Sequence, residues 1–177
     1  MLWLRRTIFA ARVLAAVLTV VAADVASAAM LSVGDTFPTW TLQDQTGKDV
    51  SSSDLAGKTY LIWFFPKAMT PGCTAEGRGL RDQYEGFKKK GVEVFGVSFD
   101  EPAANAAFVA AEAFPFRLLS DRKHTLALAV GAADSPEQPV ARRISYLVGP
   151  DGTVQHVYGT VTPASHAADV LAEAAGS

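Results

Sequence analysis

Short apolar runs alternate along the chain with stretches whose apolar residues recur at helical spacing. Residues 59–65 (TYLIWFF) and 92–99 (VEVFGVSF) are nearly continuous apolar and aromatic runs. Runs of this kind are typical of strands buried on both faces of a sheet that helices cover. Residues 73–90 lie between them and carry an apolar stripe at the spacing i, i+4, i+7, formed by Leu80, Tyr84 and Phe87. This stripe predicts a helix with one buried face, and the glycine that follows ends it.

The remaining blocks continue the alternation and indicate one domain of the α/β class. Further helices are expected over 103–113, 121–128 and 164–175, and further strands over 40–42, 116–119, 144–148 and 154–158. Asp100 stands where a carboxylate can cap the helix that follows, and Asp121 is expected to begin the helix that runs through Leu128. Pro150-Asp151-Gly152 separates the last two strands and predicts an antiparallel hairpin. We therefore expect an α/β sandwich whose central sheet is mixed.

The first 28 residues have the composition of a secretory signal peptide. Arg5 and Arg6 form a positive start, residues 13–23 are apolar except for one threonine, and residues 26–28 (ASA) form a small-residue cleavage site. These three parts occur in the order that a cleaved export signal requires. The sequence thus predicts a signal peptide over 1–28 and a domain over 29–177, exported to the periplasm or secreted.

Two alternatives concern this leader. A membrane anchor needs about 20 apolar residues to span ~30 Å of hydrocarbon, and the uncharged stretch is shorter because Asp24 closes it. We therefore expect no stable membrane insertion after cleavage. The Arg5-Arg6 pair also fits a twin-arginine export signal, although Leu4 stands where a polar residue is usual. The sequence leaves the export route open.

Charge argues against a nucleic-acid partner. Residues 1–28 hold three of the 16 basic and one of the 18 acidic residues, so the remainder has 13 basic and 17 acidic residues and a net charge of −4. Its one basic run, Lys88-Lys89-Lys90, lies at the end of a predicted helix, where cations stabilise the negative end of the helix dipole. A domain that binds nucleic acid would carry a larger basic surface.

Cys73 is the only cysteine, so no internal disulfide can form. A lone cysteine in an exported protein is a buried inert thiol, an intermolecular bridge or a reactive nucleophile. Cys73 follows Thr70-Pro71-Gly72 at the start of a predicted helix, where free N–H groups and the helix dipole favour a thiolate. A thiolate can attack one oxygen of a peroxide. The hydroxyl of Thr70, loop N–H groups and an arginine could then donate hydrogen bonds to the departing oxygen.

At this point the sequence resembles a known family. The spacing Pro66-x-x-x-Thr70-x-x-Cys73 is similar to the active-site pattern of peroxiredoxins, and residues 67–82 (KAMTPGCTAEGRGLRD) resemble the peroxiredoxin Q, or bacterioferritin comigratory protein, branch. Other segments that resemble this branch are 96–100 (GVSFD), 118–121 (LLSD) and 143–148 (RISYLV). The resemblance covers nearly all of 31–175.

The resemblance implies a thioredoxin-like fold, with helices on both faces of the sheet, and a thiol-dependent peroxidase that reduces hydrogen peroxide and organic hydroperoxides. Cys73 would be the peroxidatic cysteine, oxidised to a sulfenic acid. Thr70 would position the peroxide, Pro66 would shield the thiolate from water, and Arg143 would hold the thiolate and the developing oxyanion. Strand alternation would turn the neighbouring Arg142 to the other face.

One position departs from the family pattern. Many members of this branch have a second, resolving cysteine five residues after the first, and Arg78 occupies that position here. The resemblance therefore implies a one-cysteine member that an external thiol must recycle, either a thioredoxin-like protein or a small thiol. We find no clear exposed apolar stripe and expect a monomer or a weak dimer.

Other chemistry has little support in the sequence. His124, His156 and His166 share no metal-ligand spacing, so we expect surface or satisfied core histidines and neither metal nor cofactor. Glu76 suits the first helical turn and is expected to be structural or supporting. Thr70 could also be a helix cap. Two other functions remain open: a thioredoxin-like disulfide exchanger, which usually needs a C-x-x-C pair, and a non-catalytic binding or holdase-type domain.

Overall fold

The computed structural model describes residues 29–174, and the leader expected over 1–28 lies outside this range. A sheet of seven strands has the order β2-β1-β5-β4-β3-β6-β7. Its strands are β1 (Thr41–Asp44), β2 (Asp49–Ser51), β3 (Thr59–Phe64), β4 (Val92–Ser98), β5 (Arg117–Ser120), β6 (Ile144–Val148) and β7 (Val154–Tyr158). β3, β4 and β5 are parallel and the other neighbouring pairs are antiparallel, so the prediction of a mixed sheet is confirmed.

β3 lies between β4 and β6 and is buried almost throughout. Its alternate side chains enter two separate cores, with Tyr60, Ile62 and Phe64 on one face and Leu61 and Trp63 on the other. Both faces of the sheet are therefore covered, as the continuous apolar run predicted.

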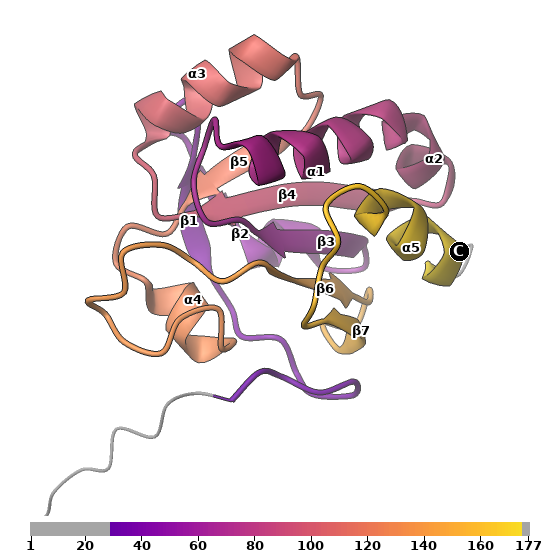
Figure 1. Cartoon of the computed structure of the whole chain (residues 1–177). Coiled ribbons are helices and arrows are strands. Elements are labelled where there is room, and N and C mark those ends of the chain that lie inside the picture. The colour runs from indigo at the N-terminus through magenta and orange to yellow at the C-terminus, as the bar shows by residue number, and fades with distance from the viewer. Residues whose placement is uncertain (1–28, 175–177) are drawn as a thin grey trace, which may run out of the picture.

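Helices cover the two faces unequally (Figure 1). Four of them, α1 (Pro71–Asp82), α2 (Tyr84–Lys89), α3 (Pro102–Glu112) and α5 (His166–Glu173), lie together on one side of the sheet, and α4 (Thr125–Ala129) lies on the other. A short 3₁₀ helix, η1 (Ser52–Leu55), places Leu55 in the core on the α4 side. The prediction of an α/β fold with helices on both faces is confirmed.

The helix expected over 73–90 is divided in the structure. α1 ends at Asp82, and α2 begins at Tyr84 after Gln83, which has a non-helical φ of −103° and ψ of 8°. Three glycines within this stretch lower its helix propensity, so the helix axis can change direction at little cost. Leu80 and Phe87 of the predicted stripe remain fully buried on either side of the break.

Neither Asp100 nor Asp121 has the position that the sequence predicted. Asp100 does not cap α3; its Oδ2 instead accepts hydrogen bonds from Ala68 N (2.8 Å) and Ser98 Oγ (3.0 Å). The carboxylate thereby fixes the loop that follows β3. Asp121 accepts from Thr125 N (3.0 Å) and Ala127 N (2.8 Å), so α4 begins four residues later than expected.

At the two edges of the sheet, the hydrophobic pattern predicted some strands and missed one. β6 and β7 match the strands predicted over 144–148 and 154–158. β2 was not predicted, since its three residues are too few to show an alternating pattern.

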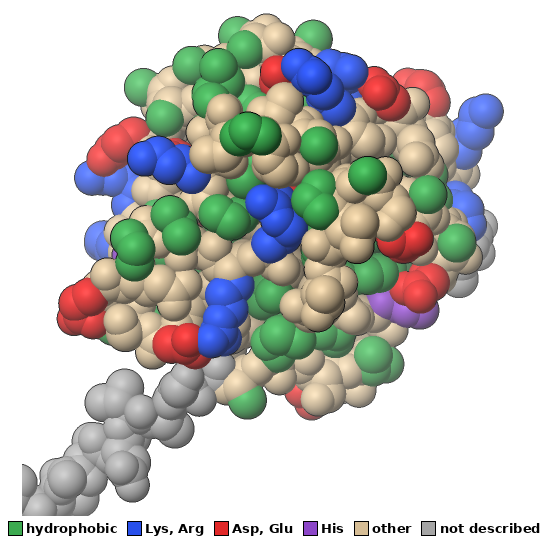
Figure 2. Space-filling model, viewed as in Figure 1, with side chains coloured by type: hydrophobic (Ala, Val, Ile, Leu, Met, Phe, Trp, Pro, Cys, Tyr) green, Lys and Arg blue, Asp and Glu red, His purple; other side chains and the backbone are tan. Residues whose placement is uncertain are grey.

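Residues 29–174 contain no membrane-spanning helix, and the face drawn in Figure 2 has no dominant charge. No helix there is long and apolar enough to cross a membrane. On the face shown in Figure 2, basic and acidic side chains are interspersed and neither sign forms a continuous patch.

The packing of α1 against the segment after α3 generates a first prediction. A Cβ at Gly77 would lie 2.4 Å from the ring of the buried Phe114, whereas a Cβ at Gly79 would meet the Cβ of Ala167 at an ordinary 3.7 Å. Gly77→Ala should therefore lower the free energy of unfolding by about 1–3 kcal/mol through overpacking.

The matched control is Gly79→Ala in the same helix, which should raise stability by up to about 1 kcal/mol because alanine favours the helix. Urea unfolding of both variants tests the pair, and equal effects of the two substitutions would contradict the packing described here.

Candidate active site

Cys73 lies in the first turn of α1, directly after the loop that leaves β3, and its side chain is fully buried. Thr70 is the N-cap residue, with extended backbone angles, and Pro71 is the first helical residue. The bond from Thr74 N to Thr70 O (2.8 Å) is the first turn of the helix. The N–H groups of Gly72 and Cys73 precede it and have no acceptor within the helix. The sulfur therefore lies at the positive end of the helix dipole.

Arg143 reaches the same sulfur from another part of the sheet. It directly precedes β6, and the β3–β6 register pairs Phe64 with Ile144, so Arg143 lies where β3 ends. Its Nη2 donates to Cys73 Sγ at 3.4 Å. A Cβ at Gly72 would lie 3.0 Å from that nitrogen, so the glycine leaves room for the guanidinium. Arg142 has other partners, donating to Gly131 O (3.2 Å) and pairing with Asp134.

Glu76 holds the other side of the guanidinium. It is three residues after Cys73 on α1, it is fully buried, and its Oε2 pairs with Arg143 Nη1. Burial raises the pKa of Glu76 to about 7, although the charge and hydrogen bond of Arg143 oppose that rise. Among the described residues its other oxygen, Oε1, has no hydrogen-bond partner. Glu76 was expected to be structural or supporting, and its direct contact with Arg143 was not predicted.

A buried histidine lies behind Glu76. His166 is the first residue of α5, its Nε2 is 3.8 Å from Glu76 Oε1, and the same nitrogen is 3.0 Å from the hydroxyl of the buried Ser145. Burial lowers the pKa of His166 to about 4, so the imidazole is neutral at pH 7. It was expected to be a surface or satisfied core histidine, and the core interpretation holds. No motif spacing links it to Glu76, since the two helices meet only in the folded chain.

The remaining predicted residues lie in the loop before the helix. The hydroxyl of Thr70 donates to Lys67 O (2.9 Å) and makes no capping bond, so the alternative of a side-chain helix cap is wrong. Pro66 lies two residues after the end of β3. Both Thr70 and Pro66 are partly exposed, whereas Cys73 is fully buried.

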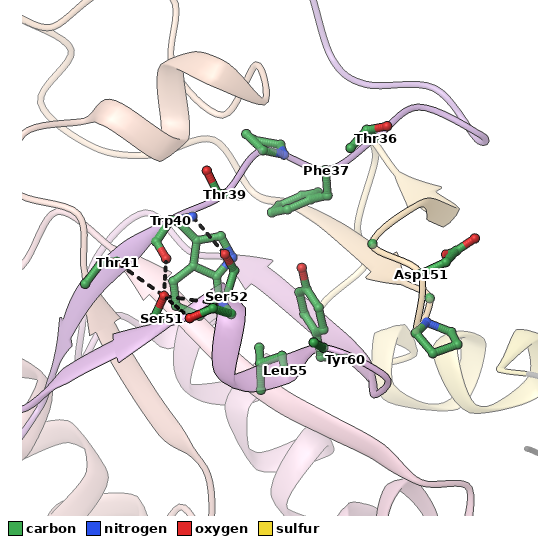
Figure 3. A pocket seen from close by; sticks show the side chains of 16 residues that line it. Thr36, Phe37, Thr39, Trp40, Thr41, Ser51, Ser52, Leu55, Tyr60 and Asp151 are labelled. Atoms are coloured by element: carbon green, nitrogen blue, oxygen red, sulfur yellow. Dashed lines mark hydrogen bonds between the residues drawn. The ribbon is translucent and has the colours of Figure 1, made fainter.

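Other places in the described part of the chain offer little competing chemistry. No group of three or more histidine, cysteine, aspartate or glutamate side chains within 29–174 could hold a metal ion. A pocket of about 460 Å³ is lined by Trp40 and Tyr60 and by several serine and threonine side chains (Figure 3). Tyr60 is near the amino end of β3, whereas Cys73 follows its carboxyl end, so this pocket is separate from the cysteine.

Comparisons with known proteins agree with this arrangement. The chain matches the model of the AhpC/TSA family over residues 33–157. Peroxiredoxin Bcp of Escherichia coli strain K12 is 38% identical over 141 residues, which cover 77% of this chain and 90% of that protein. The chloroplastic peroxiredoxin Q of Gentiana triflora is 37% identical over 144 residues, covering 81% of this chain and 66% of the relative.

Solved structures show the same fold. Peroxidoxin BcpB of Mycobacterium tuberculosis superposes with a TM-score of 0.74 at 30% identity, covering 80% of this chain and 94% of that one. The bacterioferritin comigratory protein of Xanthomonas campestris, described with alkyl peroxide reduction activity, gives 0.69 at 29% identity, covering 75% and 88%. The expected thioredoxin-like fold is confirmed. Structures of the Xanthomonas peroxiredoxin Q include serine mutants of two different cysteines, whereas Cys73 is alone here.

The two buried titratable groups generate a prediction about stability. The pKa of Glu76 is about 7 in the folded chain and near 4.5 when unfolded. Between these two pH values the folded chain binds a proton that the unfolded chain has lost. The contribution of Glu76 to the free energy of unfolding therefore falls as the pH rises from 4.5 to 7. His166 acts in the opposite direction: its pKa of about 4 lies below the ordinary 6.5, so its contribution falls as pH drops.

Glu76→Gln should remove the first contribution and leave the second. The unfolding free energy of the reduced wild type minus that of the variant should fall by about 3 kcal/mol between pH 4.5 and 7. Urea unfolding across this range measures the difference. Glu112→Gln, in a glutamate–arginine pair nearer the surface, should run parallel to wild type, and a parallel curve for Glu76→Gln would show that Glu76 is ionised throughout.

Proposed function

The chain belongs to the AhpC/TSA family of peroxiredoxins, and we propose that it is an exported member that attacks peroxides with Cys73 and is recycled by a thiol from another molecule. It is a thiol-dependent peroxidase, as its relatives named peroxiredoxin are. The resemblance noted in the sequence therefore identified both the family and the activity correctly.

The contact between Arg143 and Cys73 is the main support for a nucleophilic role of the sulfur. A guanidinium that is always charged donates to Sγ at 3.4 Å, at the positive end of a helix. Both features stabilise negative charge on sulfur, and the thiolate is the nucleophilic form. An inert core cysteine does not need a hydrogen bond from an arginine side chain.

In the first step the thiolate attacks the terminal oxygen of the hydroperoxide. The S–O bond forms as the O–O bond breaks, sulfur is oxidised to the sulfenic acid, and the electron pair leaves with the alkoxide. Arg143 and the free N–H groups of Gly72 and Cys73 are placed to donate to the charge that develops on oxygen. The hydroxyl of Thr70, now bonded to Lys67 O, would turn to the peroxide. Pro66 would limit access of water.

The second step requires a thiol from outside. Arg78 stands at the position of the usual resolving cysteine, and its guanidinium makes two hydrogen bonds to Glu112 at the end of α3 (2.6 and 3.0 Å). An ion pair between α1 and α3 therefore occupies this place. With one cysteine in the chain, an external thiol must form a mixed disulfide with Cys73 and a second thiol must release it.

The other two functions are less well supported. A disulfide exchanger normally uses a cysteine pair, and this chain has one cysteine. A binding or holdase-type domain would not need an arginine on the sulfur. Among residues 29–174 the exposed large apolar side chains are Met30, Val33 and Met69, which supports a monomer or a weak dimer.

Peroxide consumption with a dithiol reductant tests the assignment. Cys73→Ser should abolish turnover, since no other thiol exists in the chain. Arg143→Ala should slow the reaction with peroxide about 10²–10³-fold, the effect of losing one preorganised donor to an oxyanion. Thr70→Val should slow it as well.

Arg142→Ala is the matched control, because it removes the neighbouring arginine, which contacts Gly131 and Asp134 instead of the sulfur. Its rate should equal that of wild type in stopped-flow measurements. Turnover that survives in Cys73→Ser, or equal rates for the two arginine variants, would place the chemistry elsewhere.

The absence of a resolving cysteine predicts a persistent sulfenic acid. After stoichiometric peroxide, intact-mass analysis should show one added oxygen that a sulfenic-specific reagent traps, and excess peroxide should drive the sulfur on to sulfinic acid. A small thiol should restore activity. Burial of Cys73 disfavours a bridge between two chains, so a disulfide-linked dimer as the main product at low protein concentration would refute this scheme.

Export generates a separate prediction. Protein expressed with its full leader should be recovered in the periplasm or medium with an N-terminus at Ala29 or within a residue or two, since residues 26–28 form the cleavage site. N-terminal sequencing measures this. Ala26→Arg and Ala28→Arg together should block cleavage, and an intact Met1 on soluble cytosolic wild-type protein would refute export.

A further inference from the structure

Arg143 is shared by two acids in a site with little access to water. It donates Nη2 to Cys73 Sγ and Nη1 to Glu76 Oε2, both acid side chains are fully buried, and the side chain of Arg143 is 21% exposed. One guanidinium carries one positive charge. If Cys73 and Glu76 were both ionised, the buried cluster would hold a net negative charge, which a site of low dielectric strongly disfavours.

The groups around this cluster do not supply a second positive charge. His166, from α5, lies 3.8 Å from Glu76 and is neutral at pH 7 because burial lowers its pKa to about 4. Asp169, one turn further along α5, is acidic, and the buried hydroxyl of Tyr158 on β7 has a pKa raised by burial. On the α3 side, Glu112 is paired with Arg78.

The second oxygen of Glu76 points to the same conclusion. Within the described chain Oε1 has no hydrogen-bond partner, and the nearest polar atom recorded beside it, His166 Nε2, is beyond hydrogen-bond distance. A buried carboxylate normally has both oxygens satisfied. Burial also raises the pKa of Glu76 to about 7, which places its titration close to physiological pH.

We propose that Glu76 holds the proton that the peroxide reaction consumes, so that Glu76 is protonated while Cys73 is a thiolate and ionised once Cys73 is a sulfenic acid. The inference deepens the proposed function and rests on it. It makes Glu76 a positioning and proton-holding partner that acts through Arg143, and it places no bond between Glu76 and the peroxide.

The reaction is balanced with this proton. Thiolate, hydroperoxide and protonated Glu76 give sulfenic acid, alcohol and ionised Glu76: the S–O bond forms, the O–O bond breaks, and the alkoxide gains the proton that Glu76 loses. The net charge of reactants and products is the same. Because the sulfenic acid is neutral, Arg143 is then free to neutralise Glu76 alone, which stabilises the carboxylate.

Infrared difference spectroscopy can observe the proton directly. Reduced wild-type protein is held just below the pKa of Glu76, the ultraviolet absorbance of the thiolate is recorded, and one equivalent of hydrogen peroxide is added. The band of a protonated carboxyl group should lose intensity in proportion to the sulfenic acid counted by trapping and intact mass, by up to one group for each. The change should be absent in Glu76→Gln and retained in Asp121→Asn, which removes another buried carboxyl that does not contact the site.

A static titration supplies a second test that needs no turnover. In Cys73→Ser the competing thiolate is absent, so the carboxyl band of Glu76 should titrate about one pH unit or more below its midpoint in the reduced wild type. This comparison also serves if Glu76→Gln does not fold.

The outcomes separate this inference from the assigned function. Sulfenic acid formed without loss of a carboxyl band, an identical midpoint in Cys73→Ser, or a neutral thiol beside an ionised Glu76 would each overturn the inference and leave the peroxidase intact. Failure to form a sulfenic acid at all would overturn the assigned role of Cys73, and the inference with it.

Discussion

The site depends on one partly buried guanidinium that faces two buried acids. Arg143 contacts both Cys73 and Glu76. Both acids are buried, so ionising either one without a positive partner would be costly. The arginine therefore does more than stabilise a thiolate, because its charge must be divided between sulfur and carboxylate. Chemistry at the sulfur consequently changes the electrostatic environment of Glu76, and the protonation of Glu76 changes how much positive charge the sulfur receives.

The fold brings these groups together by two independent routes. Sheet register places Arg143 beside the end of β3, because β6 is antiparallel to β3 and Ile144 faces Phe64. Helix geometry places Glu76 beside Cys73, because residues three apart lie on the same face of a helix. The loop between strand and helix is fixed by Asp100, which accepts from Ala68 N. A residue that seemed to be a helix cap thus contributes to the position of the catalytic turn.

Local pattern predicted the parts of this protein that local forces determine. The continuous apolar run located β3, and the hairpin residues located β6 and β7, since burial on two faces and a tight turn leave clear signatures. Cys73 and Arg143 were assigned through resemblance to a family. The connection of Glu76 to His166 could not be predicted, because it is created by the packing of α1 on α5, between residues 90 positions apart in sequence. The break at Gln83 and β2 were missed for local reasons: the apolar stripe runs on across the break, and three residues are too few to show an alternating pattern.

Arg78 is one of several contacts that tie α1, which carries Cys73, to the rest of the fold. Here α1 is held to the end of α3 by Arg78 and Arg81, both of which contact Glu112, and to the sheet by the Glu76–Arg143 pair. These contacts oppose unwinding of the helical turn that buries the sulfur. A thiol that recycles Cys73, whether a small thiol or one on a thioredoxin-like protein, must therefore reach a sulfur that is fully buried in the resting chain.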